Sequence, residues 1–330
     1  MRILLTGGAG YIGSQIILSL IDKGYKPIII DNLSNGSKKN LPKDTVFYEA
    51  DIADEISVKK IIKDNKIESV VHLAAFTSVE ESMTNIPKYY DNNVIKSMKF
   101  LKACGESNIK NIIFSSTAAC YGINKEKVKQ VNESSMLKPI NVYGKTKLII
   151  EMVIKDLASY YNFKYAIFRF FNVAGADSKL RTGSMSKKNE HIIAKSCEYA
   201  LGIIDNFKIY GDDYNTRDGT CIRDYIHVMD IADAHVKAIK YLNTNNSFIS
   251  NLGYGKGYSV FEVLEVLQKI LGKKLKFEVT NKREGDVDIL IADNNFAIKN
   301  LNWKPNFDNI NSIIRHQLLW TKKLYKISEI

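Results

Sequence analysis

The sequence predicts an α/β fold, a doubly wound parallel sheet followed by a smaller mixed C-terminal region, and three observations support it. In the first half, short apolar runs alternate with longer segments of helical periodicity, which is typical of parallel sheets with helices on both faces. A glycine-rich segment joins the first apolar run to the first helical segment. After Asn172 the alternation ends and polar loops interrupt the pattern. We therefore predict one unit over residues 1–172 and a second over 173–330, some segments of which pack back on the first.

Each predicted element rests on its own pattern of apolar residues. Short apolar runs predict buried strands at Ile3–Thr6, Pro27–Ile30, Val46–Glu49, Ser69–Leu73, Asn111–Ser115 and Tyr165–Phe168. Helical spacing predicts helices at Tyr11–Lys23, Asp54–Asp64, Asn85–Cys104 and Tyr143–Tyr160. In the second half, helical patterns return at Ile192–Leu201, Asp230–Leu242 and Ser259–Leu271, with polar loops at Asp177–Asn189 and Gly211–Cys221.

The net charge of +11 raises the question of a nucleic-acid partner. Lysines are scattered along the whole chain with no run of five or more, so solvated faces explain the charge better, and we expect no nucleic-acid partner. A positive field of this kind also attracts an anionic diphosphate.

The apolar runs argue against a membrane protein, and the cysteines argue against a metal-binding protein. The stretch Ile16–Ile21 is broken by Ser19 and stopped by Asp22, far short of the roughly 20 residues that span a bilayer. Because no signal-peptide pattern follows the N-terminus, we expect a cytoplasmic protein without a membrane partner. The four cysteines form no CxxC pair, so we expect free thiols and no metal site; they are Cys104, Cys120, Cys197 and Cys221.

The glycine-rich segment Thr6–Gly13 has the composition of a phosphate-binding turn. Glycine lets the backbone turn tightly and approach a pyrophosphate, and the helix that begins near Tyr11 offers free N–H groups to the anion. A purely structural turn is the simpler alternative. Its position in the first strand–helix unit favours a dinucleotide.

Asp31 lies 18 residues after Gly13, at the end of the second strand. An acidic residue at about this spacing binds the adenosine ribose hydroxyls, although a strand-end Asp also caps turns. No Arg stands beside Asp31-Asn32 and a 2′-phosphate would be repelled, so we expect NAD rather than NADP. Asp51-Ile52 is placed to reach the adenine, and the small residues of Leu73-Ala74-Ala75 let a flat cofactor lie close to the backbone.

Three pairs have the spacing Tyr-x-x-x-Lys: Tyr121–Lys125, Tyr143–Lys147 and Tyr160–Lys164. Only Tyr143–Lys147 lies inside a helical segment, where residues i and i+4 share a face. There the ammonium stabilises a phenolate: a Tyr pKa of about 10 lowered by about three units corresponds to roughly 4 kcal/mol, which Lys147 and a cationic nicotinamide would supply together. A surface Tyr beside an exposed Lys is the alternative.

Hydroxyl residues end the fifth strand, in Ser115-Ser116-Thr117. The carboxyl end of a parallel strand faces the ligand crevice. Thr117 is therefore placed to bond the reacting oxygen of a substrate; alternatively, it caps its own turn.

Together these segments resemble the extended short-chain dehydrogenase/reductase family, and within it the UDP-glucose (UDP-galactose) 4-epimerase family, over essentially the whole chain. Phe170 and Lys282 depart from the pattern, which has Tyr and Arg there. The resemblance implies a Rossmann NAD-binding domain, a smaller substrate-binding region, and NAD as cofactor. Eight motifs occur in the family's order: Thr6–Gly13, Asp31–Leu33, Tyr89–Val94, Ser115–Ala118, Tyr143–Lys147, Arg169–Ala176, Asp218–Asp230 and Lys282–Asp286.

The resemblance also implies site residues. The catalytic residues would be Tyr143, Lys147 and Thr117. The cofactor would contact Gly7, Gly10, Tyr11, Ile12, Gly13, Asp31, Asn32, Leu33, Ser34, Asn35, Gly36, Asp51, Ile52, Leu73, Ala74, Ala75, Thr77, Asn92, Thr117, Tyr143, Lys147 and Phe171. The UDP-sugar substrate would contact Thr117, Tyr143, Asn172, His191, Ile192, Tyr210, Arg223, Arg283, Asp286 and Leu290.

Within that substrate set, each side chain has an implied partner. Arg223 and Arg283 would pair with the diphosphate through bidentate guanidinium contacts. Asp286 would hold a ribose hydroxyl, Asn172 a sugar or diphosphate oxygen, and Tyr210 would lie near the uracil. A salt bridge within the protein is the alternative for each Arg.

The expected reaction is reversible inversion at C4 of a UDP-hexose. Tyr143 takes the proton of the sugar 4-hydroxyl with help from Thr117, the C4 hydride passes to NAD, the keto sugar turns about its bond to the diphosphate, and hydride returns to the other face. Related 4,6-dehydratases carry an acid pair where this chain has Ala118-Ala119, which disfavours elimination. A dehydratase or 4-reductase is the alternative enzyme. An inactive NAD-sensing protein is the alternative of another class, and intact Tyr143 and Lys147 argue against it.

Two more expectations concern partners and specificity. Family members pair through the two helices that correspond to 85–104 and 143–160, so we expect a homodimer unless their apolar residues face the sheet. Leu290 is expected beside the sugar C2 substituent, where a residue smaller than Tyr admits an acetamido group; alternatively it faces the core. We therefore predict that N-acetylated hexoses are accepted as well. The expected dimer seam consists of Ile95, Met98, Leu101, Ile149, Met152 and Val153.

Overall fold

The computed structural model describes residues 1–122, 130–186, 191–283 and 286–327, and its centre is a seven-stranded parallel sheet of order β10-β6-β5-β4-β1-β2-β3. The six strands predicted from the first half of the chain are confirmed, and β10 from the second half adds the seventh. The strands are β1 (Arg2–Thr6), β2 (Lys26–Asp31), β3 (Val46–Glu49), β4 (Ser69–His72), β5 (Asn111–Thr117), β6 (Lys164–Phe170) and β10 (Phe248–Leu252).

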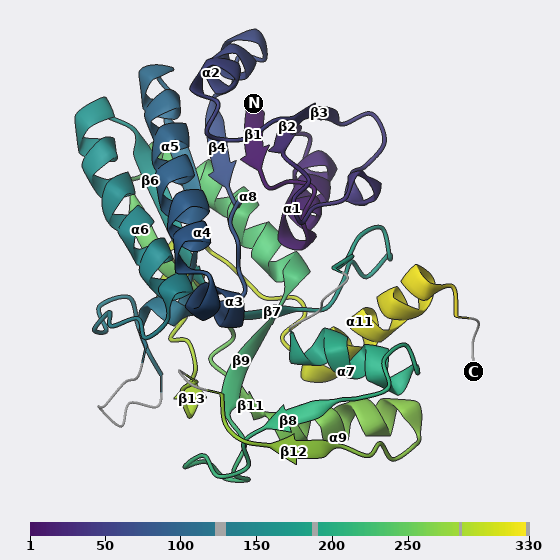
Figure 1. Ribbon diagram of the computed structural model, residues 1–330. Coiled ribbons are helices and arrows are strands. Elements are labelled where there is room, and N and C mark those ends of the chain that lie inside the picture. Colours follow the sequence, from purple (N-terminus) through teal and green to yellow (C-terminus); the bar gives the residue numbers. More distant parts are fainter. Residues whose placement is uncertain (123–129, 187–190, 284–285, 328–330) are drawn as a thin grey trace.

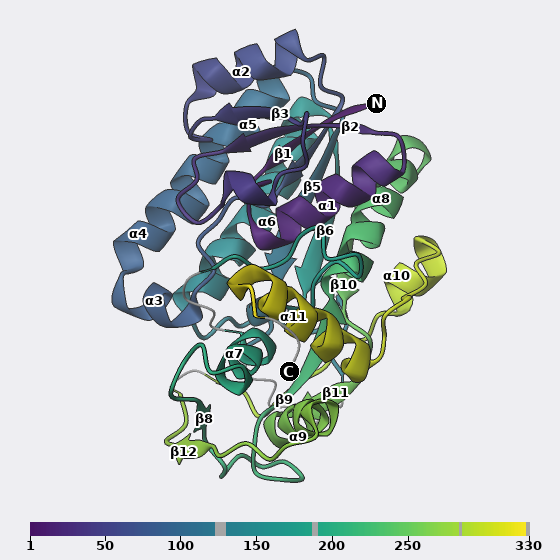
Figure 2. The same ribbon diagram turned by 90° about the vertical axis from the view of Figure 1, so that its right-hand side faces the viewer.

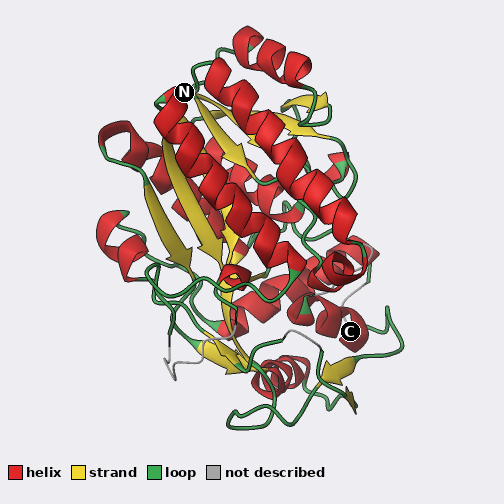
Figure 3. Ribbon diagram, turned by 60° about the vertical axis from the view of Figure 1, so that its left-hand side comes forward, coloured by secondary structure: helices red, strands yellow, loops and turns green. Residues whose placement is uncertain are grey.

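Helices cover both faces of this sheet (Figure 3). Ile3 and Leu5 of β1 belong to one core, which includes α1 (Tyr11–Asp22) and α8 (Val228–Thr244). Leu4, which points the other way, belongs to a second core with residues of α2 (Glu55–Asp64), α5 (Ser97–Glu106) and α6 (Val142–Tyr161). Because both faces are buried, the strands are continuous apolar runs, and the doubly wound α/β prediction is confirmed.

The order of the strands reverses between β1 and β4. The chain moves outward from β1 to β3 and then returns to the other side of β1. Connections that leave the carboxyl ends of strands in opposite directions open a crevice there. The glycine-rich turn after β1 and Thr117 at the end of β5 therefore lie at the same edge of the sheet.

The helix predicted at Asn85–Cys104 is confirmed, but it is not α-helical throughout: α4 (Ile86–Tyr90) continues into one π-helical segment η2 (Asp91–Lys96) and then into α5, with α3 (Val79–Thr84) before it. The buried Asn93 lies in the π-helical segment. Its amide donates to the Phe76 carbonyl (2.9 Å) and to Thr146 Oγ1 (3.2 Å), and its Oδ1 accepts from the Phe76 N–H (2.9 Å). These bonds join the β4–α3 loop to α6, and π-helical turns recur at functional sites.

The second half of the chain forms a smaller set of elements beyond that edge of the sheet (Figures 1 and 2). β9 (Ile222–His227) pairs with β7 (Asn172–Ala174), β11 (Gly257–Ser259) and β13 (Ile289–Leu290). β8 (Lys208–Tyr210) pairs with β12 (Glu278–Thr280). The remaining elements of this half are α7 (Ile192–Ala200), α9 (Val260–Leu271), α10 (Asn295–Asn300) and α11 (Ile310–Tyr325). The 3₁₀ turns η1 (Lys38–Asn40) and η3 (Ala118–Cys120) belong to the first half. β10 and α8 also come from this half but belong to the large sheet and its helical layer, and a boundary near Asn172 stays a prediction.

Three of the six apolar side chains predicted to form the dimer seam are exposed on the surface. The side chains of Ile95, Met98 and Met152 are 52%, 53% and 50% exposed. Leu101 is fully buried in the core beneath the sheet, so its assignment to the seam is wrong: its position on α5 turns it toward the strands. All four thiols are free, as predicted, and in the described part of the chain no helix is long and apolar enough to cross a membrane.

Candidate active site

The glycine-rich turn lies against the end of β4. Gly7 has a φ of +70°, which only glycine adopts easily, and a Cβ there would lie 2.8 Å from the backbone nitrogen of Ala74. A Cβ on Gly13 would overlap the Gly7 carbonyl, so α1 begins directly on the turn. The glycine-rich turn therefore packs directly on the backbone at the end of β4, and a contact between Leu73-Ala74-Ala75 and a cofactor stays a prediction.

Asp31 lies at the carboxyl end of β2 and is 8% exposed. Its carboxylate accepts the N–H of Ala9 from the glycine-rich turn (3.0 Å) and the N–H of Leu33 (2.8 Å). Burial raises the pKa of Asp31, and these two backbone N–H groups oppose that shift. The carboxylate is thus fixed beside the turn, and each oxygen has a lone pair left for a ribose hydroxyl.

Asp51, the second acidic strand-end residue, makes contacts with its neighbours. It accepts from the Lys96 ammonium (2.8 Å) and from the Asn32 amide (3.3 Å). These bonds orient Asp51 and Asn32 at the same rim as Asp31, where we propose that the adenosine binds.

Tyr143 and Lys147 occupy the first turns of α6, which begins where Asn141 Oδ1 accepts the Gly144 N–H (2.8 Å). The Tyr143 hydroxyl is hydrogen-bonded to the Thr117 side chain. Lys147 is 3% exposed, and its Nζ donates to the Ser115 carbonyl at 2.8 Å. The structure thus brings the three predicted catalytic side chains together at the carboxyl end of β5.

The two titratable groups of this trio have opposite pKa shifts. Burial raises the pKa of the Tyr143 hydroxyl, and the hydrogen bond from Thr117 opposes it. Burial lowers the pKa of Lys147 to about 8, while Cys120 and Glu151 work against that shift. Tyr143 is therefore a neutral phenol in the protein alone, which agrees with the expectation that Lys147 lowers its pKa only together with a cationic nicotinamide.

Four of the predicted substrate residues lie on short strands beyond the large sheet, namely Asn172, Tyr210, Arg223 and Leu290. Arg223 on β9 is 8% exposed and donates to Asp286 Oδ1 at 2.8 Å. The Arg283 guanidinium lies 3.8 Å from the centre of the Tyr210 ring. Each of these cations thus already contacts another predicted substrate residue. For Arg223 the contact is the salt bridge that was the alternative to diphosphate binding, and for Arg283 it is a cation–π contact with Tyr210.

Leu290 and Asn172 both stand on strands that pair with β9, the strand that carries Arg223. Leu290 on β13 is the register partner of Arg223 and packs against the cluster that contains Ala118, Tyr121 and Phe171. Asn172 on β7 pairs with Tyr225 on β9. Leu290 is partly buried, so its packing agrees in part with the core alternative and still places it near the residues that follow Thr117.

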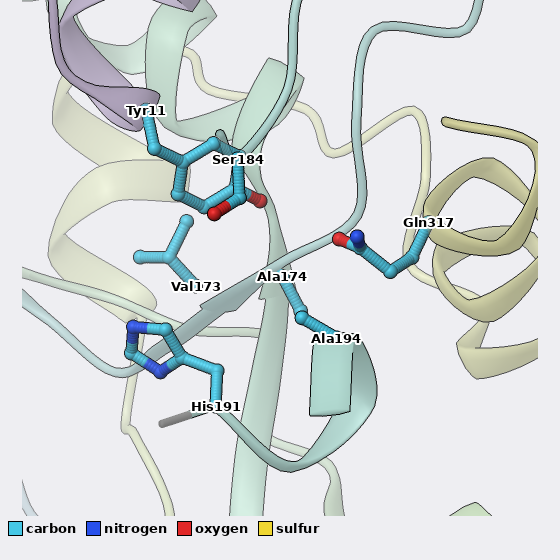
Figure 4. Close-up of a pocket in the computed structure, with 7 residues that line it drawn as sticks. All are labelled: Tyr11, Val173, Ala174, Ser184, His191, Ala194 and Gln317. Carbon is cyan, nitrogen blue, oxygen red and sulfur yellow. The ribbon is translucent and has the colours of Figure 1, made fainter. Parts of the chain in front are cut away.

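A small pocket joins the two halves of the site (Figure 4). The Tyr11 ring and the His191 imidazole lie on one side of it and Gln317 on the other. The Tyr11 hydroxyl donates to the Gly175 carbonyl at 2.5 Å, which ties the glycine-rich turn to the segment after β7. A predicted cofactor residue and a predicted substrate residue therefore line one pocket, together with Val173, Ala174, Ser184 and Ala194.

Sequence reasoning missed several polar residues that the structure buries next to the site. Asn93 and His72 are examples, and His72 joins Thr6 Oγ1 (2.7 Å) to Ser97 Oγ (3.0 Å). Glu151 and Arg169 are others, paired at 2.8 Å. The helical spacing that selected Tyr143 and Lys147 continues to Glu151, four residues further, and that signal would have found it.

A doubly wound sheet with a glycine-rich turn, an acidic β2 end and a Thr–Tyr–Lys group defines the class of dinucleotide-dependent enzymes of the short-chain dehydrogenase type. The profile described as "NAD dependent epimerase/dehydratase family" matches residues 3–253, and the chain belongs to this family.

Named relatives cover almost the whole chain. A UDP-glucose 4-epimerase of Halalkalibacterium halodurans is 42% identical over 98% of this chain and 96% of its own. The structure of a UDP-glucose 4-epimerase from Bifidobacterium longum in complex with NAD+ and UDP superposes with a TM-score of 0.93 at 34% identity, covering 98% of both chains. A UDP-Glc/GlcNAc 4-epimerase from Campylobacter jejuni superposes with a TM-score of 0.83 at 40% identity, covering 98% of this chain and 99% of its own.

The residues present here fit NAD, the cofactor of the family. The turn leaves no room for a side chain at Gly7, Asp31 is buried at the end of β2, and no Arg stands beside Asp31-Asn32 to neutralise a 2′-phosphate. The sequence-based preference for NAD is therefore confirmed by the family and consistent with the site.

Proposed function

We propose that the protein interconverts UDP-glucose and UDP-galactose by inverting C4 of the sugar. The observation that carries the proposal is the Thr117–Tyr143 hydrogen bond beside buried Lys147, at the carboxyl end of β5. Ala118 and Ala119 follow Thr117 in η3, where elimination of water would need an acid. Named UDP-glucose 4-epimerases that cover the whole chain support the same activity.

The chain's own residues supply proton transfer and orientation. Tyr143 takes the proton from the sugar 4-hydroxyl and returns it, with Thr117 bonded to the same oxygen. NAD, when bound, supplies a reversible hydride acceptor and a cationic ring. Lys147, together with the positive charge that NAD would supply, would lower the pKa of Tyr143 against the effect of burial.

The substrate half holds the part of the molecule that does not react. Arg223 and Arg283 bind the diphosphate, and Asp286 binds a ribose hydroxyl once the diphosphate takes the Arg223 guanidinium from it. Tyr210 lies beside the uracil. A sugar that is held only through its diphosphate can turn and present either face to the same Tyr143, which is what inversion at one carbon needs.

The decisive experiment is incubation of purified protein with UDP-galactose without added NAD, with UDP-glucose measured by a coupled assay. We expect turnover supported by NAD retained from expression. A 4-keto-6-deoxy product would indicate a dehydratase instead, and absence of any product from NAD-loaded protein would reject the proposal.

We also propose a homodimer formed through α5, α6 and the π-helical segment between α4 and α5. Ile95, Met98 and Met152 are half exposed on these neighbouring helices and give the face an apolar character. Light scattering at micromolar concentration should give twice the chain mass, and Met98→Glu should give a monomer. A wild-type monomer would contradict the proposal.

A wider specificity is the finer part of the proposal. Leu290 lacks the hydroxyl and the bulk of a Tyr, which leaves room for an acetamido group at C2. We expect conversion of UDP-GlcNAc as well as UDP-galactose, and Leu290→Tyr should lower only the former, by about tenfold. A wild type inert toward UDP-GlcNAc rejects this part alone, and acceptance that survives Leu290→Tyr moves the selectivity to other residues.

A further inference from the structure

A buried polar cluster lies directly behind the reactive end of β5. The Glu151 carboxylate receives Arg169 Nη2 at 2.8 Å and Arg169 Nε at 3.1 Å, a bidentate contact. The Ser116 hydroxyl donates to the same carboxylate at 2.5 Å. Glu151 is fully buried and Arg169 is 1% exposed, so these charges have no access to water.

The three residues come from three elements that meet at the catalytic trio. Ser116 stands on β5 between Ser115, whose carbonyl accepts from Lys147, and Thr117, which bonds Tyr143. Arg169 on β6 is the register partner of Ser116. Glu151 lies one helical turn beyond Lys147 on α6 and two turns beyond Tyr143. One carboxylate therefore joins the strand that carries Thr117 to the helix that carries Tyr143 and Lys147.

The cluster extends toward the substrate half. Arg169 Nη1 donates to the Tyr121 hydroxyl (3.1 Å), and Tyr121 donates to Asn251 Oδ1 (2.6 Å). The Asn251 amide in turn donates to the carbonyls of Val131 (2.9 Å) and Asp293 (3.2 Å). Val131 forms a β-bridge with Ala292, two residues after Leu290, so the hydrogen bonds run from Thr117's strand to the segment beside the sugar candidates.

Stability alone does not account for this arrangement. A buried ion pair costs desolvation free energy, and well-packed apolar residues of the same volume are often as stable or more so. An ion pair with fixed bidentate geometry holds the elements that carry it in one position relative to each other. Here those elements carry all three reacting side chains.

We propose that Glu151 and Arg169 are positioning residues, which through Ser116 hold the end of β5 and the start of α6 at the spacing that the Thr117–Tyr143–Lys147 group needs. The inference rests on the proposed function for the role of that group. It assigns no proton transfer to Glu151 or Arg169, because neither touches the reacting atoms.

The first test removes only the connecting hydroxyl. Ser116→Ala leaves the ion pair intact, and we expect kcat for UDP-galactose, per NAD-loaded protein, to fall about tenfold with little change in KM or thermal midpoint. The matched control is Ser69→Ala: Ser69 is equally buried, on β4 at the opposite end of the sheet, and accepts from Asn111 at 3.4 Å. We expect wild-type kcat from it.

The second test varies the guanidinium. Arg169→Lys keeps the charge and loses the bidentate fork, whereas Arg169→Met leaves Glu151 unpaired. We expect kcat to fall in the order wild type, Arg169→Lys, Arg169→Met, with the KM for UDP-galactose nearly constant. Wild-type kcat in both Ser116→Ala and Arg169→Lys, with only a lower thermal midpoint, would overturn the inference and leave a structural role.

Crystal structures separate this inference from the proposed function. In Ser116→Ala the contact from Lys147 Nζ to the Ser115 carbonyl, 2.8 Å in the wild type, should lengthen, as should the Thr117–Tyr143 bond. Unchanged distances would refute the positioning role even if the protein is an epimerase. Lengthened distances would support it even if the wild type fails to convert UDP-galactose.

Discussion

Tyr143 and Lys147 stand on a helix of 20 residues that packs on a parallel sheet, whereas Arg223 and Leu290 stand on strands of six and two residues. In the first region the polar groups find their partners within the protein: Lys147 at Ser115, Tyr143 at Thr117, and Asp31 at two backbone N–H groups. In the second, Arg223 donates to the carbonyls of Ile222 and Asp288 and to the carboxylate of Asp286, whose side chain is 34% exposed.

This difference indicates that the first region is suited to the chemical step and the second to ligand binding. A side chain fixed by regular elements on both sides keeps a placement suited to chemistry, where small displacements are costly. Arg223 can exchange its one partly exposed carboxylate partner for a ligand while its backbone contacts keep it in place. Changes in the first region should therefore lower kcat, and changes in the second should raise KM.

The largest expected effect is on the first region. Tyr143→Phe removes the general base while preserving the ring that packs at the start of α6, so kcat should fall roughly a thousandfold with NAD content and thermal midpoint retained. Stopped or steady-state assays with UDP-galactose measure the loss. Activity within tenfold of wild type would show that Tyr143 is not the base.

A smaller effect, with the opposite kinetic signature, is expected in the second region. Arg223→Met removes a charge-assisted contact worth about 1.5–3 kcal/mol, so KM for UDP-galactose should rise by about 10- to 100-fold while kcat changes much less. Arg217→Met is the control, because Arg217 forms a surface ion pair with Glu262. A loss that falls entirely on kcat would break the division between the two regions.

Cofactor binding gives the next test. Asp31→Ala removes the carboxylate at the end of β2 and should weaken NAD binding by about 10- to 30-fold, measured by the NAD retained through gel filtration. Asp64→Ala, which removes an exposed partner of Lys60, should have no such effect. If the wild type binds NADP as tightly as NAD, the assignment of Asp31 to the ribose is incorrect.

The smallest effect concerns the cost of burying polar groups in the first region. His235 on α8 is fully buried against Phe168 and Phe170, and burial lowers its pKa to about 4 from an ordinary value of 6.5. The unfolded chain therefore takes up a proton below pH 6.5 that the folded chain refuses, so the stability present above that pH is lost as the pH falls toward 4.

The variant His235→Met tests this contribution. Met has a similar volume and no titration, so the gain in unfolding free energy of the variant over the wild type should grow by about 2 kcal/mol between pH 7 and pH 5. Denaturant unfolding at both pH values measures it. His316→Gln serves as a control for a more exposed imidazole. A difference in unfolding free energy between variant and wild type that is constant with pH would show that His235 takes up its proton as readily in the folded protein as in the unfolded chain.

Much of the fold follows from local pattern. Continuous apolar runs such as Ile28–Ile30 specify strands buried on both faces, and the glycines of Thr6–Gly13 specify a turn that only glycine permits. The i, i+4 spacing of Tyr143 and Lys147 fixed their common face before any tertiary contact. For these residues the chain itself contains the reason, because backbone geometry and burial act over a few positions.

Tertiary structure decided the rest, where the partner is distant in sequence. Leu101 has the apolar character of a seam residue, and only the packing of α5 on the sheet turned it inward. The helix predicted at Asn85–Cys104 contains a π-helical segment around Asn93, whose partner Thr146 is 53 residues away. Glu151 and Arg169 lie 18 residues apart on a helix and a strand, and their pairing depends on how α6 lies across β5 and β6. Side-chain hydrogen bonds across elements have no period in the sequence, because their geometry is set by layer packing rather than by the backbone of either element.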